Sequence, residues 1–136
     1  MKTYQNFAYV LNRLLAGKQA VRLNVEGYMP LVIERIGASG DGRPLIALSH
    51  TAVQNGDLMR DPEIVFELHE LGAEPITFRN DFVGVLQDVY EYDDSGRRTR
   101  VYLSRKADLR SFARIWFRNI RAQGFLGSSV RREDLA

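Results

Sequence analysis

Acidic, basic and amide side chains crowd together within residues 57–81, around several turn signals, and these are the residue types best suited to chemistry. The polar side chains that could form one site there are Asp57, Arg60, Asp61, Glu63, Arg79, Asn80 and Asp81. Carboxylates at strand ends supply the hard oxygen ligands that Mg²⁺ prefers. Convergence of the carboxylates between Asp57 and Glu67 would therefore indicate a metal-dependent, nuclease-like enzyme.

Two features of the same stretch favour a structural role instead. A nuclease of this kind usually has a lysine near its carboxylates to bind phosphate, and Lys2, Lys18 and Lys106 are all distant in sequence from any acidic pair in a predicted strand. The acidic and amide residues also suit turns, since the dipeptide Asn80-Asp81 can form an Asx turn. We therefore expect a hairpin framework, with no metal and no cofactor.

The two histidines raise a second metal hypothesis. His50 and His69 both lie in predicted strands, and with Glu67 or Asp57 they could form a three-ligand zinc site. Their spacing matches no compact ligand motif, however. The chain also lacks a cysteine nucleophile, a Gly-x-Ser-x-Gly elbow and a phosphate-binding loop leading to a Lys-Ser or Lys-Thr pair. No complete catalytic constellation is predicted, which favours a non-enzymatic protein.

Four arginines form the clearest binding signal. Arg110, Arg114, Arg118 and Arg121 follow one another at helical spacing, so their guanidinium groups lie along one line and suit phosphate groups. From Arg97 onward the net charge is +8, whereas the preceding 96 residues carry −6. This asymmetry indicates a nucleic-acid or acidic protein partner. The alternative is that the arginines are solvated or pair with the acidic first part of the chain.

Composition indicates one globular domain. A chain of 136 residues, 45% hydrophobic and 26% charged, can bury about two thirds of its unfolded surface. The absence of cysteine excludes disulfides and thiolate metal sites. No apolar run approaches the ~18 residues of a membrane span, and Asn6, Asn12 and Arg13 interrupt the N-terminal apolar pattern. We expect a cytoplasmic protein without a membrane partner, whose oligomeric state is open.

Amphipathic helices are predicted near both ends of the chain. The first covers residues 3–17, with Thr3 as its cap, and ends at Gly17, because glycine takes the left-handed conformation of a helix C-terminus without steric cost. The second covers residues 104–123, with Ser104 as its cap. Ile115 lies off the apolar face of the second helix, which hints at a further packing partner such as another subunit.

The segments between these helices have the patterns of strands. Residues 21–25 alternate apolar and polar, Asn55-Gly56 is a strong type I′ hairpin signal, and Asp61-Pro62 predicts a bulge or a bend. Residues 82–92 indicate one long strand that pairs with residues 99–103. We predict an α+β fold in which the two helices cover a mostly antiparallel sheet of about six or seven strands. Residues 1–126 would form the domain and residues 127–136 a flexible C-terminal tail.

Two segments, QNGDLMRDPEIVFEL and PITFRNDFVGVLQDVYEY, precede a helix that ends near AQGF. This order resembles an uncharacterised family of small domain-of-unknown-function proteins encoded on bacterial mobile elements, namely conjugative elements, plasmids and phages. The resemblance covers residues 50–125 and implies a genomic setting without transferring functional residues. Our leading hypothesis is a non-enzymatic accessory protein that binds a nucleic acid or protein partner. The alternatives are the metal-dependent enzyme and a structural or oligomer-forming domain.

Overall fold

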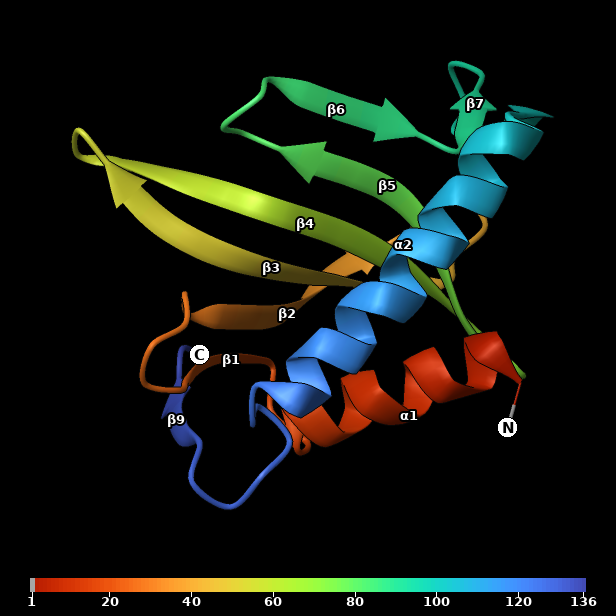
Figure 1. The fold of residues 1–136 in the computed structure, drawn as a ribbon. Coiled ribbons are helices and arrows are strands. Elements are labelled where there is room, and N and C mark those ends of the chain that lie inside the picture. The colour runs from red at the N-terminus through yellow and green to blue at the C-terminus, as the bar shows by residue number, and fades with distance from the viewer. Residues whose placement is uncertain (1) are drawn as a thin grey trace.

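Two helices pack on one face of a strongly curved antiparallel sheet in the computed structural model, which describes residues 2–136 (Figure 1). The helices are α1 (Thr3–Leu15) and α2 (Leu103–Ala122). The strands are β1 (Ala20–Asn24), β2 (Leu31–Ala38), β3 (Pro44–Gln54), β4 (Asp57–His69), β5 (Gly72–Asn80), β6 (Val85–Asp88), β7 (Tyr90–Tyr92), β8 (Arg98–Val101) and β9 (Arg131–Asp134). Seven strands form the main sheet in the order β6-β5-β4-β3-β2-β1-β9, which confirms the predicted α+β fold.

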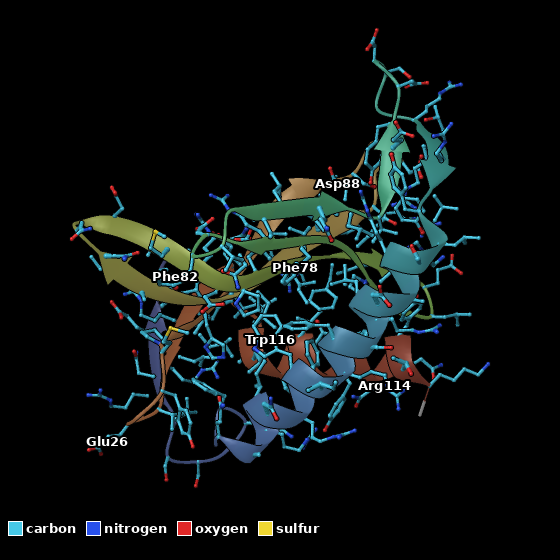
Figure 2. All side chains as sticks on the ribbon, turned by 45° about the horizontal axis from the view of Figure 1, so that its top comes forward. Glu26, Phe78, Phe82, Asp88, Arg114 and Trp116 are labelled. Carbon is cyan, nitrogen blue, oxygen red and sulfur yellow. The ribbon has the colours of Figure 1, made fainter. Side chains whose placement is uncertain are left out.

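One hydrophobic core lies between the helices and the sheet. Phe7 of α1 packs against Phe66 of β4 and Phe117 of α2, with ring centroids 5.7 and 4.8 Å apart. Aromatic rings bury a large area and so dominate the energy of such a junction. Phe78 of β5 and Trp116 of α2 also lie between the sheet and the helix (Figure 2). The helices are therefore held to the sheet and to each other by one aromatic cluster.

The β3–β4 hairpin follows the sequence closely. Asn55 and Gly56 have φ angles of 53° and 84°, the positive values that a type I′ turn requires. Farther along, Ser49 pairs with Glu63 and Thr51 with Arg60, so one residue of β3 faces two residues of β4. This irregularity falls at Asp61-Pro62 and confirms the predicted bulge, because proline offers no backbone N–H to the ladder.

The predicted long strand over residues 82–92 is wrong. Residues 81–84 form a turn, β6 ends at Asp88, and the chain leaves the main sheet at Val89. Val89 is 1% exposed, and its N–H donates to the carbonyl of Ile76 at 2.9 Å. Burial of this side chain turns the backbone away from the sheet. The strands β7 and β8 that follow form a separate two-stranded ribbon.

Both helices begin before the position that the predicted capping residues imply. Thr3 and Ser104 lie inside the first turns of α1 and α2, and neither caps its helix. At the start of α1, Oε1 of Gln5 accepts the backbone N–H of Lys2 at 3.2 Å instead. The N–H of Tyr102 donates to the carbonyl of Val89 at 2.8 Å. This bond fixes the chain at the entry to α2 in place of a capping serine.

The end of the chain also differs from the expected flexible tail. Residues Arg131–Asp134 form β9, which pairs antiparallel with β1. Ion pairs between Arg22 and Glu133 at 3.0 Å, and between Lys18 and Asp134 at 3.6 Å, accompany the backbone pairing. Without β9, β1 would be an unpaired edge of the sheet. The C-terminal segment is therefore part of the sheet.

The first turn of α1 approaches the start of β5 so closely that Gly72 has no room for a side chain. A Cβ there would lie 2.5 Å from the carbonyl carbon and oxygen of Tyr4. We predict that Gly72→Ala lowers the free energy of unfolding by about 2–3 kcal/mol, because the helix or the strand must move. Urea denaturation followed by circular dichroism measures this loss.

Gly42→Ala is the matched control for this substitution. Gly42 has a φ of +77°, and a Cβ at this position would have no atom within 4 Å. Alanine there adds backbone strain of about 1 kcal/mol but no collision. Equal losses in the two variants would contradict the role of close packing at Gly72.

Candidate functional site

Asp81 is the centre of the polar cluster that the sequence singles out. Its Oδ2 accepts a hydrogen bond of 2.8 Å from the backbone N–H of Arg60, and its Oδ1 lies 2.6 Å from Nε of Arg79. The N–H of Asp81 donates in turn to the carbonyl of Arg60 at 2.9 Å. These bonds fasten the turn between β5 and β6 to the bulged part of β4.

The neighbouring side chains complete this network. Asn80 donates from Nδ2 to Oδ1 of Asp61 at 2.6 Å, while its Oδ1 accepts the N–H of Phe82 at 3.0 Å in an Asx turn. Glu63 pairs with Nε of Arg60 at 3.1 Å. Asp57 lies at the distant β3–β4 hairpin and takes part in none of these bonds. The structure thus brings six of the seven predicted residues together as a set of paired groups.

This pairing acts on the ionisation of the carboxylates. Burial raises the pKa of Asp81, but the hydrogen bonds from Arg79 and from the Arg60 backbone outweigh burial, so its pKa lies below the ordinary value. Burial has the larger effect on Glu63 and raises its pKa despite Arg60 and Arg79. None of the seven residues belongs to a group of metal-ligating side chains in the part of the chain that the structure describes. Their geometry is that of a structural fastener.

His50 lies apart from this cluster, in the hydrophobic core. Its ring packs between those of Trp116 and Phe125, with centroids 5.7 and 5.6 Å away, and its Nδ1 is 3.1 Å from the carbonyl oxygen of Met29. Burial lowers its pKa. The structure therefore does not bring the two histidines together as zinc ligands.

The four arginines of α2 that the sequence predicts to bind a partner are all exposed to solvent. Within residues 2–136, Arg110, Arg114, Arg118 and Arg121 have no carboxylate within 4.0 Å. Other basic residues do pair with the acidic first part of the chain, as Arg98 does with Glu67. The structure therefore does not support the alternative that these four arginines pair with the acidic first part of the chain.

These arginines line the junction of the two helices. Residues on both sides form a depression lined by Thr3, Asn6, Phe7, Val10, Arg114, Phe117, Arg118 and Arg121. An adjoining depression is lined by Lys2, Thr3, Tyr4, Gln5, Leu71, Arg110, Ser111 and Arg114. Because the two share Thr3 and Arg114, we name them together the arginine groove. Figure 2 shows Arg114 on α2 close to α1.

The opposite wall of the arginine groove adds no negative charge. The sequence of α1, TYQNFAYVLNRLL, contains no aspartate or glutamate, and α2 contains only Asp108. Position 114 is three residues from Phe117 and four from position 118, so Arg114 shares a helix face with each of them, and all three residues line the depression at the helix junction. The groove therefore concentrates positive charge along one line.

A second polar cluster lies at the other end of β4. The zinc hypothesis names two of its members, Glu67 and His69, but not the third, Glu74. Glu67 and Glu74 are directly opposite each other in the β4–β5 pairing, and His69 follows Glu67 on the same face of β4. We name these three the carboxylate–histidine cluster. Glu67 is 0% exposed and Glu74 is 7% exposed. The signal for this cluster was the hairpin symmetry about residues 70–71, which pairs Glu67 with Glu74 and His69 with Gly72.

Cations and a hydroxyl surround the carboxylate–histidine cluster. NH2 of Arg98 lies 2.6 Å from Oε2 of Glu67, and its guanidinium stacks 3.9 Å from the ring centroid of Tyr90. The hydroxyl of Tyr90 donates to Oε2 of Glu74. Burial raises the pKa of Glu67, but Arg98 and Ser39 outweigh it and bring the pKa below its ordinary value. Burial and the bond to Glu74 raise the pKa of Tyr90, so the phenol keeps its proton.

The fold and these clusters define a small α+β domain with a basic groove between its two helices and a buried acidic cluster at one end of its sheet. The chain belongs to the family described as a domain of unknown function (DUF6908), whose model matches residues 2–126. No curated protein and no solved structure matches the chain. Within residues 2–136, neither helix is long and apolar enough to cross a membrane.

The Asp81 fastener leads to a pH-dependent prediction. We expect Asp81→Asn to lower the free energy of unfolding by about 1–3 kcal/mol at pH 7, since hydrogen bonds to charged groups are worth about that much. Because the folded pKa of Asp81 is depressed, its stabilisation is present above the unfolded pKa of ~3.9 and is lost as the pH falls through the folded pKa. Urea unfolding at pH 7 and pH 3 measures the difference.

Asp57→Asn is the control for this prediction, because Asp57 is exposed and lies outside the fastener. Its effect should stay within about 0.5 kcal/mol at both pH values. A loss in Asp81→Asn that does not shrink on acidification would contradict the proposed role of the ionised carboxylate.

Proposed function

We propose that this protein binds nucleic acid through the arginine groove, as a non-enzymatic accessory protein of a bacterial mobile element acting in the cytoplasm. The observation that carries the proposal is the set of four exposed arginines without carboxylate partners, facing a helix without acidic residues. Exposed guanidinium groups bind phosphate oxygens in a bidentate manner, and release of counterions drives the association. The genomic setting rests on the resemblance of residues 50–125 to proteins of mobile elements.

The length of the arginine groove suits a phosphate backbone. At a rise of ~1.5 Å per residue, Arg110 and Arg121 are about 16 Å apart along α2. That length equals about five base-pair steps along the axis of a duplex, at ~3.4 Å each. The walls of the groove offer cations and small polar side chains, such as Thr3 and Asn6. Its aromatic members are either buried, as Phe7 and Phe117 are, or half-buried, as Tyr4 is. We therefore expect contact with the sugar-phosphate backbone and little preference for sequence.

The distribution of ion pairs supports this choice over the metal-dependent enzyme. Glu63 and Asp81 are paired with arginines, and Asp61 accepts a bond from Asn80, and none of these carboxylates belongs to a group of converging metal-ligating side chains among the described residues. The arginines of the groove have no carboxylate partner within residues 2–136, so their guanidinium groups are accessible to a binding partner. An acidic protein surface would bind the same groove. Direct binding measurements distinguish such a partner from nucleic acid.

We predict that the double substitution Arg114→Ala/Arg118→Ala weakens binding to nucleic acid about ten- to hundredfold at low salt, because two charge-assisted contacts are lost. The slope of log K against log salt concentration should fall by about 2, close to one unit for each phosphate contact. Fluorescence anisotropy with labelled mixed-sequence duplex DNA and single-stranded RNA measures both quantities.

The matched control is Arg43→Ala/Arg97→Ala, which removes the same charge from two loop positions outside the groove. It should leave the salt slope nearly unchanged. Equal loss in both variants would mean that net charge alone drives binding. Failure of the wild-type protein to bind either nucleic acid at low salt would remove this function and leave an acidic protein as the partner to seek.

A further inference from the structure

The oxygens of the carboxylate–histidine cluster are divided between two kinds of neighbour. Oε2 of Glu67 faces Arg98, while Oε2 of Glu74 accepts a bond from Tyr90 and lies 3.8 Å from Nζ of Lys106. The remaining oxygens face the histidine instead. Nε2 of His69 is 2.8 Å from Oε1 of Glu67 and 3.7 Å from Oε1 of Glu74. Oε2 of each carboxylate thus contacts a cation or a hydroxyl, and Oε1 of each carboxylate lies near Nε2 of His69.

The atoms that meet at His69 are buried and close to each other. Oε1 of Glu67 and Nε2 of His69 lie 2.8 Å apart, and neither atom is accessible to solvent. A buried polar atom without a partner is costly, so such atoms in native proteins nearly always have one. The two atoms can pair with each other only when the ring proton lies on Nε2. With that proton on Nδ1, both atoms present lone pairs that a shared cation can accept.

We propose that Oε1 of Glu67, Nε2 of His69 and Oε1 of Glu74 bind one divalent transition-metal ion, Zn²⁺ or Mn²⁺. The three atoms lie within 4.8 Å of one another. Ligands at about 2.0–2.2 Å from Zn²⁺ in a tetrahedral site are separated by roughly 3.3–3.6 Å, so small side-chain movements bring all three into range. This site is separate from the arginine groove and does not depend on nucleic-acid binding.

The surroundings match those of known metal ligands. Carboxylates that bind a metal are usually themselves held by hydrogen bonds or charges, the part that Arg98, Tyr90 and Lys106 play here. One imidazole nitrogen with two carboxylate oxygens favours Zn²⁺ or Mn²⁺ over Ca²⁺, which takes six to eight oxygen ligands. The side chain of His69 is 30% exposed, which gives an ion a path from solvent. Three protein ligands also leave room for a water molecule on the metal.

A hydrogen bond donated by Nε2–H of His69 to the two carboxylates is the competing explanation for the same contacts. It requires no ion, and it places a proton on Nε2, where the metal would otherwise bind. Metal titration separates the two, because only the metal site gives saturable binding of one ion per chain.

The test is isothermal titration calorimetry of untagged, chelator-treated protein with ZnCl₂, MnCl₂ and CaCl₂ at pH 7. We expect one Zn²⁺ or Mn²⁺ per chain and far weaker binding of Ca²⁺. His69→Ala and Glu74→Gln should each weaken binding at least about tenfold, whereas Glu70→Gln, which alters an exposed carboxylate in the same turn, should not.

Circular dichroism and urea unfolding establish that each variant is folded before titration. If His69→Ala fails to fold, Glu74→Gln decides the outcome, because glutamine keeps an oxygen that can accept the Tyr90 hydroxyl. Absence of Zn²⁺ and Mn²⁺ binding by the wild-type protein would overturn the proposal, as would an unchanged affinity in the folded variants.

Discussion

The contact of Phe7 with Phe66 and Phe117 is the interaction on which the rest of the structure depends. It joins α1, the interior strand β4 and α2 in one buried cluster, with all three rings less than 5% exposed. Arg114, three residues before Phe117, and Arg118, four residues after Arg114, line the junction of the helices beside this cluster. The same docking brings the first turn of α1 against Gly72 at the start of β5. The arginine groove and the end of the β4–β5 hairpin are both consequences of how the aromatic rings pack.

Burial decides which charges of this protein are neutralised within the fold. Glu67 is fully buried, and an unpaired ion there would be costly, so Arg98 accompanies it. The four arginines of the groove are exposed to solvent and need no internal carboxylate partner. The two charged regions meet at the start of α1. Tyr4 lies close to both Glu74 and Arg110. Burial, and then the negative charge of Glu74, raise the pKa of Tyr4, while Arg110 lowers it. The domain thus separates a buried acidic cluster from an exposed basic groove over a short distance.

Local patterns in the sequence predicted the features that depend on neighbours along the chain. The Asn55-Gly56 turn and the bulge at Asp61-Pro62 follow from backbone preferences that act within a few residues. The break at Val89 could not be predicted in this way, since alternation is the same for a continuous strand and for one that leaves the sheet. Strand β9 was missed because RRED has no apolar alternation; it forms where the edge of β1 offers backbone partners.

The sequence by itself determined the α+β class, the two amphipathic helices, the central hairpin and the exposure of four arginines on one helix stripe, because helical and strand periodicities are local properties. Tertiary structure alone decided what lies opposite each of these surfaces. The acid-free wall of α1 faces the arginines only because both helices pack on the same face of the sheet. Likewise, Glu74 meets Glu67 and His69 only through the register of β4 with β5, which is set by hydrogen bonds between strands and by the packing of the core beneath them.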